Sequence, residues 1–285
     1  NEYGAVKYFG VNTFTSGIFR SWYSMGDVET ASLLAVLLFF IVVLFFSIER
    51  YLNSRYKFNY TPNTKKFKNE PPSFKNRFII HLVCLIPIIL GFLIPVLFII
   101  NNVIYEFSRI DFIKVFNLTT NTVIISLIAT LIILVIAVYF QFLKRILKNR
   151  TITFFNEVIS LTYALPGAVI GLSLILLFTS YPFENELLIG SFGILVYAYV
   201  IRYMAVGLSP LKSSFDKHPS SYDDTAFNLG MGPTKLFRSI HLPINKSAIA
   251  IAFLITFVDI IKELPITLIL RPFNFDTLAV QTYEY

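Results

Sequence analysis

Two carboxylates lie close together at the end of an apolar stretch of the sequence. Asp259 and Glu263 are four residues apart, so on a helix they would lie about one turn apart on one face. Carboxylate and phenolate oxygens are ligands that hard cations prefer. Three further residues near the two ends of the sequence offer such oxygens: Glu2, Tyr283 and Tyr285. We therefore expect Glu2, Asp259 and Glu263 to be candidates for a cation path. A structural role is equally consistent with the sequence, because Lys262 could neutralise either acid and charges at helix ends commonly lie at the headgroup level.

Other residue types that do chemistry are scarce. The three histidines, His81, His218 and His241, are far apart in the sequence, so each is better explained as a structural residue than as a metal ligand. Cys84 is the only cysteine, which excludes an intrachain disulfide and a cysteine metal cluster. No GxxxxGK[ST] run occurs, so the chain is not expected to bind the phosphates of ATP itself. We predict no catalytic residues and no bound cofactor.

The composition indicates that these side chains are positioned by membrane-spanning helices. The 285 residues are 55% hydrophobic and 14% charged, whereas about a quarter of the residues in soluble domains are charged. A hydrocarbon core is crossed by about 20 apolar residues in a helix. Six stretches approach or reach that length: 31–48, 78–100, 119–142, 158–178, 187–201 and 248–261. Buried helices of a large soluble protein would need amphipathic helices to cover them, and too few are present.

The expected fold class is therefore an all-α, polytopic transmembrane helical bundle in contact with membrane lipid. In the second stretch, Pro87, Gly91 and Pro95 predict a kink. In the fourth stretch, Gly167 and Gly171 form a pair of small residues that favours close helix packing.

Basic residues predict the orientation, because loops rich in Lys and Arg stay in the cytoplasm. Residues 49–77 contain eight bases against two acids, and a second basic group lies between the third and fourth stretches: Lys144, Arg145, Lys148 and Arg150. Both connections are expected inside, which also makes residues 205–246 cytoplasmic and places residues 1–28 and 266–285 outside. This topology accounts for the net charge of +7, so nucleic acid is not expected as a partner.

The loop at 205–246 has the pattern of a short helix, a glycine turn and a second short helix. Ser221 and Asp224 form a variant of the capping box. Gly230 suits the left-handed position that closes a helix, and Pro233 suits the first turn of the next one. An ordinary polar connector would explain the same segment, whereas a DNA-binding helix-turn-helix is disfavoured by the flanking spans.

The same loop contains Asp224-Thr225-Ala226, three residues, Gly230, nine residues and Ile240-His241-Leu242-Pro243. This pattern resembles the EAA motif of binding-protein-dependent ABC import permeases, which is Glu-Ala-Ala, three residues, Gly, nine residues and Ile-x-Leu-Pro. The spacing is kept, with Asp and Thr at the first two positions. The resemblance implies a type I ABC importer fold whose loop couples to separate ATP-binding cassette subunits, which use the ATP. The implied coupling residues are Asp224, Thr225, Ala226, Phe227, Gly230, Ile240, Leu242 and Pro243. Ala226 and Phe227 near the helix tip are expected to insert as an apolar knob.

A second resemblance concerns the substrate. It is carried by residues 2–4, 8–11, 13–18, 163–167, 262–267, 270–273 and 275–279. With these segments, most of the chain resembles the end of the first half and most of the second half of fused ferric-iron permeases, with the loop 49–77 matching in character only. The resemblance implies a bacterial inner-membrane permease that receives ferric iron from a periplasmic substrate-binding protein.

The expected organisation follows from this resemblance. Residues 1–48 would be an external segment and the last helix of a first permease half, 49–77 a basic cytoplasmic linker, and 78–285 a second half with the coupling loop. Glu2–Val6 also resembles Glu263–Thr267, as internal repeats of transporters would. Because the sequence has no initiator Met and the family has a further final span, we expect a fragment.

Three alternatives remain at this stage. A permease of the same class could carry thiamine, a polyamine or another small solute. An ion-coupled secondary transporter would need no ATPase, and a structural membrane protein would need no substrate.

Overall fold

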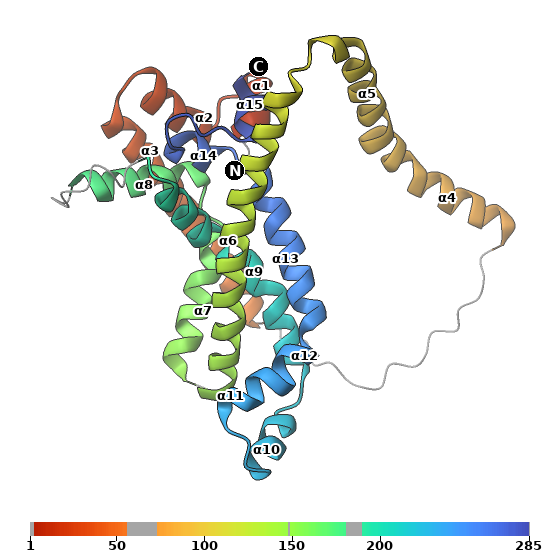
Figure 1. Cartoon of the computed structure of the whole chain (residues 1–285), viewed down its shortest axis with the longest axis vertical. Coiled ribbons are helices and arrows are strands. Elements are labelled where there is room, and N and C mark those ends of the chain that lie inside the picture. Colours follow the sequence, from red (N-terminus) through yellow and green to blue (C-terminus); the bar gives the residue numbers. More distant parts are fainter. Residues whose placement is uncertain (1–2, 56–72, 148, 181–189, 285) are drawn as a thin grey trace. The chain divides into compact units, whose positions relative to one another are not determined.

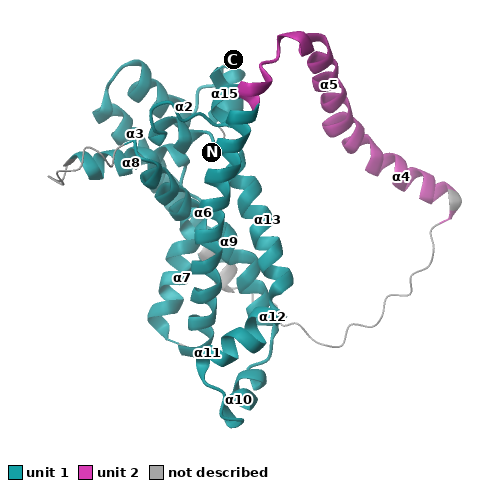
Figure 2. Cartoon of the chain, viewed as in Figure 1, with its two compact units in different colours: residues 1–52, 116–285 teal, residues 53–115 magenta. Residues whose placement is uncertain are grey.

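The computed structural model describes residues 3–55, 73–147, 149–180 and 190–284. Within these ranges the regular secondary structure is all helical and contains no strand, which confirms the predicted fold class. It forms two compact units, residues 1–52 with 116–285 and residues 53–115 (Figure 2). Most of the predicted linker 49–77 lies outside the described residues, so the predicted domain boundaries stay predictions.

In the smaller unit, residues 74–109 form a nearly continuous helix. It comprises α4 (Phe74–Ile88), a π-helical turn (Ile89–Leu93), α5 (Ile94–Glu106) and a 3₁₀ turn (Phe107–Arg109). The π turn lies between Pro87 and Pro95, as expected where prolines interrupt the regular hydrogen bonds of a helix. Apolar side chains such as Phe92 and Phe98 are exposed along it, which suits a helix surrounded by lipid.

The larger unit contains the remaining helices (Figure 1). They are α1 (Tyr3–Tyr8), α2 (Phe14–Phe19) with a π turn (Arg20–Ser24), α3 (Val28–Arg55), α6 (Phe112–Leu147), α7 (Arg150–Thr162), α8 (Gly167–Ser180), α9 (Phe192–Lys217), α10 (Ser221–Asn228), α11 (Pro233–Leu236) with a π turn (Phe237–His241), α12 (Leu242–Ile244), α13 (Lys246–Ile261), α14 (Pro265–Leu270) and α15 (Leu278–Glu284). Within this unit α10 lies at one end and α15 at the other.

Among the described residues, four helices are long and apolar enough to cross a membrane, and up to six spans result if each of two bent helix pairs counts as one. The four are Val28–Glu49, Lys75–Arg109, Phe112–Leu147 and Phe192–Lys217. The predicted fourth stretch is not a straight helix, because α7 and α8 meet at 110°. Pro166 explains this break, since it lacks an amide hydrogen and disfavours helical backbone at Leu165. The helix of the fifth stretch, α9, continues beyond the predicted Ile201 to Lys217.

Helix α6 has one face that packs against the protein and an apolar surface that is exposed. Its buried residues recur every three or four positions, from Leu118 through Thr122 and Ile125 to Ala129 and Ile133. This spacing is one face of a helix. Apolar side chains on the remaining surface are exposed, so the helix packs on protein along one face and presents hydrocarbon elsewhere.

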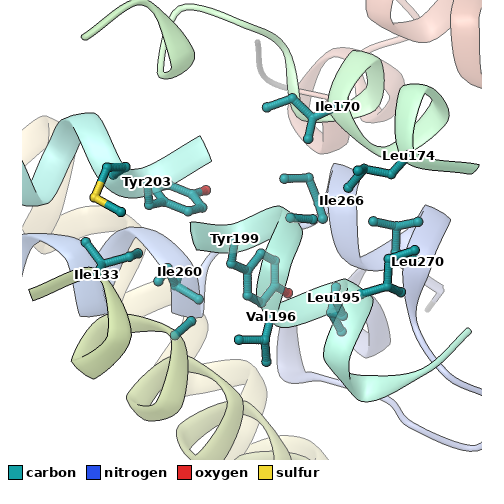
Figure 3. Close-up of a cluster of buried hydrophobic side chains, with 14 of the residues drawn as sticks. Ile133, Ile170, Leu174, Leu195, Val196, Tyr199, Tyr203, Ile260, Ile266 and Leu270 are labelled. Carbon is teal, nitrogen blue, oxygen red and sulfur yellow. The ribbon is translucent and has the colours of Figure 1, made fainter. Parts of the chain in front are cut away.

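The core lies where α9 meets α6, α8, α13 and α14 (Figure 3). Tyr199 and Leu195 of α9 point into this cluster, together with side chains of the four other helices: Ile133, Ile170, Leu174, Ile260, Ile266 and Leu270. The hydroxyls of Tyr199 and Thr267 form a hydrogen bond of 2.6 Å. This bond satisfies two polar groups that burial would otherwise destabilise.

Candidate functional site

Helix α10 ends in the glycine turn that the sequence predicts. Gly230 has a φ of +76°, in the left-handed region that a Cβ atom disfavours. The amide of Met231 donates to the carbonyl of Ala226 at 3.0 Å, and the amide of Gly230 donates to that of Phe227 at 2.9 Å. This pair of bonds is the Schellman motif, which closes a helix by satisfying its last carbonyls. Pro233 follows as the first residue of α11, also as predicted.

The predicted capping box at the start of α10 is wrong. Ser221 is the first helical residue, and the N-cap Ser220 makes no side-chain capping bond. Ser220 has helical backbone angles, φ −66° and ψ −19°, whereas a capping side chain normally needs extended backbone. The helix is held at this end by a different residue, Asp223.

Helix α10 has one inward and one outward face. Asp223 and Ala226, three residues apart, are buried, and Ala226 packs with Phe142 and Leu236. Ala226 is only 2% exposed, so its predicted role in an apolar knob is wrong. Phe227 is 41% exposed. The outward face also presents Tyr222, Asp224, Thr225 and Leu229.

Asp223 joins α10 to two other helical segments. Its Oδ2 accepts from Arg145 Nε of α6 at 2.6 Å, and its Oδ1 lies 2.8 Å from Nε2 of the buried His241. Arg145 also donates to the carbonyl of Phe215 in the last turn of α9 at 2.7 Å. It donates to two carbonyls just after this helix as well, those of His218 at 2.9 Å and Pro219 at 2.8 Å. Arg145 therefore satisfies carbonyls at a helix end and neutralises a buried acid. We call Arg145, Asp223 and His241 the α10 anchor.

The remaining predicted coupling residues flank this anchor. Ile240 is half-buried beside the apolar cluster around Ala226, and Leu242 packs on the main core. Pro243 is exposed in α12. Ile240 and Leu242 thus hold the second helical segment, Pro233–Ile244, against the protein and do not extend the outward face of α10.

A second group of polar residues lies around Glu263, which is 5% exposed. Its Oε1 is 3.4 Å from Nη1 of Arg202, and its Oε2 accepts a hydrogen bond from the Tyr203 hydroxyl. The amide of Ile266, in the first turn of α14, donates to Oε1 at 3.1 Å. Arg202 is itself only 6% exposed, so this is a buried ion pair with one weakly engaged partner.

The sequence predicted Asp259 and Glu263 on one helix, and this prediction is wrong. Helix α13 ends at Ile261, and Glu263 lies in the link before α14. Both residues nevertheless line one cavity of about 480 Å³, together with Tyr163, Arg202 and Tyr203. Lys262 Nζ lies 2.8 Å from Asp259 Oδ1, as the structural alternative foresaw for one of the acids. The neutralising partner of Glu263, Arg202, was not foreseen.

The predicted glycine pair of α8 packs closely. A Cβ atom on Gly167 would lie 2.0 Å from Arg202 Nη1 and 2.6 Å from Glu263 Oε1. A Cβ on Gly171 would lie 3.0 Å from Ile269. Gly167 thus leaves the space in which the buried ion pair sits.

The other sequence candidates are dispersed. Glu2 and Tyr285 lie outside the described residues. The Tyr283 hydroxyl is 3.0 Å from that of Tyr3, and Tyr3 itself lines the cavity of Glu263. Within the described residues, no three His, Cys, Asp or Glu side chains gather closely enough to hold a metal ion.

Comparison with known proteins identifies relatives of two kinds. The Fe(3+)-transport system permease protein FbpB 2 of Haemophilus influenzae is 25% identical over 289 aligned positions, which cover 100% of the chain and 56% of that protein. Maltose/maltodextrin transport system permease proteins MalG are similar over 94 residues. The MalG of Escherichia coli K12 is 32% identical there, over 33% of the chain and 31% of the relative. No family model matches.

The chain is similar to ABC import permeases along its whole length. The resemblance stated from its sequence is thereby confirmed. Together with the apolar helices, this similarity makes the chain a multi-pass protein of the bacterial inner membrane. The chain spans about half the length of the iron-permease relative, 56%, and a smaller share of the MalG permeases.

Proposed function

We propose that the chain is part of the transmembrane permease of an ATP-driven ABC importer for ferric iron. The observation that carries the proposal is the outward face of α10, a short helix closed by a Schellman turn and held by a buried anchor. A periplasmic substrate-binding protein would deliver the ion, and separate ATP-binding cassette subunits would supply the energy.

The outward face of α10 has the chemistry of a docking surface. It combines the half-exposed rings of Tyr222 and Phe227 with the exposed carboxylate of Asp224. Aromatic side chains that enter a partner's pocket provide much of the energy of protein interfaces. In this proposal Phe227 is the apolar knob, Asp224 and Thr225 contribute polar contacts, and Ala226 supports them from inside.

The α10 anchor connects the docking surface mechanically to the membrane helices. Arg145 connects α10 to α6 and to the end of α9, and His241 connects it to the segment that leads into α13. Helix α9 packs against α7, α8, α13 and α14. A displacement of α10 by the ATPase subunits would therefore move α9 with it as a rigid body.

The cavity around Glu263 suits the transit of a hard cation better than its storage. Asp259, Glu263, Tyr163 and Tyr203 offer carboxylate and hydroxyl oxygens. Each acid, however, already has a basic partner, Lys262 for Asp259 and Arg202 for Glu263. A passing ion must bind strongly enough to enter and weakly enough to leave, and acids with such partners limit the strength of binding.

The docking surface is tested by co-purification of the full-length permease with its ATPase subunits. Phe227→Asp and Asp224→Lys are expected to reduce the recovered ATPase at least about tenfold, because truncating or repelling an interface anchor costs about 2 kcal/mol or more. Asp216→Lys is the matched control, since Asp216 is an exposed acid at the end of α9 and not on α10. Unchanged recovery in both α10 variants would refute docking at this face.

The substrate is tested by energy-dependent uptake of radioactive ferric iron in cells that carry the full-length permease and its partners. Glu263→Gln and Asp259→Asn are expected to lower the uptake rate while the ATPase subunits still co-purify. If thiamine or a polyamine is accumulated and iron is not, the substrate assignment is wrong. Iron uptake that is indifferent to both substitutions would remove these two acids from the path.

A further inference from the structure

Two cavities lie in succession along α9 and α13. The first, about 480 Å³, is the cavity of Glu263. The second, about 460 Å³, is lined by Asn156, Ser160, Ser209 and Lys212 among others. Both cavities are lined by the same two residues, Tyr163 and Asp259, and by no other residue in common.

The order of the cavities follows from the direction of two helices. Helix α9 runs towards α10. It lines the first cavity with Arg202 and Tyr203, but the second with later residues, from Ala205 through Ser209 to Lys212. Helix α13 runs away from the α10 end (Figure 1), and it lines the second cavity with Ile255 before it reaches Asp259. Both helices therefore place the second cavity nearer to α10 and the first nearer to α15.

The contact between Tyr163 and Asp259 is weak. The Tyr163 hydroxyl donates to Asp259 Oδ2 at 3.4 Å, whereas O–H···O bonds are usually about 2.5–3.0 Å long. Tyr163 follows the last residue of α7 at the 110° bend, so its position is not fixed by a continuing helix. Asp259 is held mainly by Lys262, a side chain that is 67% exposed.

We infer that Tyr163 and Asp259 form a gate between two successive cavities of the translocation path. The inference rests on the proposed transport function. Opening requires loss of one long hydrogen bond and rotation of the Tyr163 ring. A cation that arrives from the first cavity meets Asp259 and takes the place of the Lys262 ammonium group. The hydroxyl and amide oxygens of Ser160, Ser209 and Asn156 then offer neutral ligands on the α10 side.

Cysteine labelling tests the gate without any measurement of transport. In the full-length transporter with its ATPase subunits, Cys84→Ser removes the natural thiol of these 285 residues, and any other reactive thiol of the transporter is replaced likewise. Two reporters are then made separately, Thr282→Cys in the first cavity and Ser209→Cys in the second. A cationic, membrane-impermeant methanethiosulfonate is added, without ATP, on the side from which the Thr282→Cys reporter reacts. The Ser209→Cys reporter is expected to react slowly from that side.

Substitutions at the gate should change only the labelling rate of the second reporter, Ser209→Cys. Tyr163→Ala is expected to raise the labelling rate of the Ser209→Cys reporter about tenfold, equivalent to a barrier lowered by about 1.4 kcal/mol. Tyr163→Phe, which keeps the ring and loses the hydrogen bond, should raise it about threefold, and it serves if the alanine variant does not fold. Tyr197→Ala is the control, because Tyr197 is an exposed tyrosine of α9 that lines neither cavity.

Two results would overturn the gate. The first is equal labelling of both reporters in the parent protein, which would mean that the cavities are already continuous. The second is a Ser209→Cys rate that neither Tyr163 substitution changes relative to Tyr197→Ala. Failure of iron uptake would not produce either result, so the substrate assignment and the gate fail separately.

Discussion

Replacement of Gly167 by alanine tests the packing of the buried ion pair. The new Cβ would lie 2.0 Å from Arg202 Nη1, and ordinary contacts begin at 3.4 Å, so the guanidinium must move by about 1.4 Å. It is already 3.4 Å from Glu263, so the movement disturbs an ion pair whose members are both buried. Overpacking costs about 1–3 kcal/mol, and separating a buried pair about 3–5 kcal/mol. We expect Gly167→Ala to destabilise the protein by about 3 kcal/mol, between these two ranges.

The measurement is thermal unfolding of the purified full-length permease in detergent. A loss of this size should lower the Tm by roughly 3–5 °C in a protein of this length or longer. Gly193→Ala is the control, because a Cβ there would meet only Ser191 Oγ at 3.7 Å. Arg202→Lys removes the closer of the two clashes and leaves the one with Glu263 Oε1 at 2.6 Å, so in that background Gly167→Ala should cost less but not become neutral. A Gly167→Ala protein as stable as the Gly193→Ala protein would show that the pair does not depend on this glycine.

Two further predictions concern the α10 end. Gly230→Ala should destabilise the turn by about 1–2 kcal/mol, because residue 230 has a φ of +76°. The variant should therefore be cleaved faster by protease near α10. Gly230→Asn should have a smaller effect, because asparagine tolerates this backbone region better. An equal rate in both variants would contradict the strain argument. Arg145→Met should leave Asp223 buried without its strongest partner, and hydrogen exchange in α10 should accelerate; adding Asp223→Asn should recover part of the protection. Unchanged exchange in Arg145→Met would mean that the anchor does not hold α10.

The fold class could be predicted because it depends on local properties of the sequence. Apolar stretches near the thickness of a bilayer predicted the spans, and Gly230 and Pro233 predicted the turn between two short helices. The break between α7 and α8 was missed even though Pro166 marks it, because prolines also occur inside helices, as Pro87 and Pro210 do here. Whether a proline bends a helix depends on the neighbours that replace its missing hydrogen bond.

The residue roles in α10 depended on a choice that the sequence leaves open. Asp223 and Asp224 are adjacent acids in the first turn, and either could cap, anchor or dock. Only the inward direction of Asp223, towards Arg145 in α6 and His241 beyond the turn, assigns it to the anchor. This leaves Asp224, the residue at the acidic position of the coupling signature, on the outward face. The structure thus assigns the two adjacent acids different positions, Asp223 in the buried anchor and Asp224 on the outward face.

The residues around Glu263 could also be predicted only in part. Lys262 was foreseen as a partner for an acid because it is near both acids in sequence, and it pairs with Asp259. Arg202 and Tyr203 lie about sixty residues before Glu263, directly after residue 201, where the predicted fifth stretch ends. The structure continues this span to Lys217 and so places Arg202 inside it, where ionisable groups are rarely without a partner. Applied to Arg202, this rule would have predicted a buried acid on a neighbouring helix or link, and Glu263 meets that description.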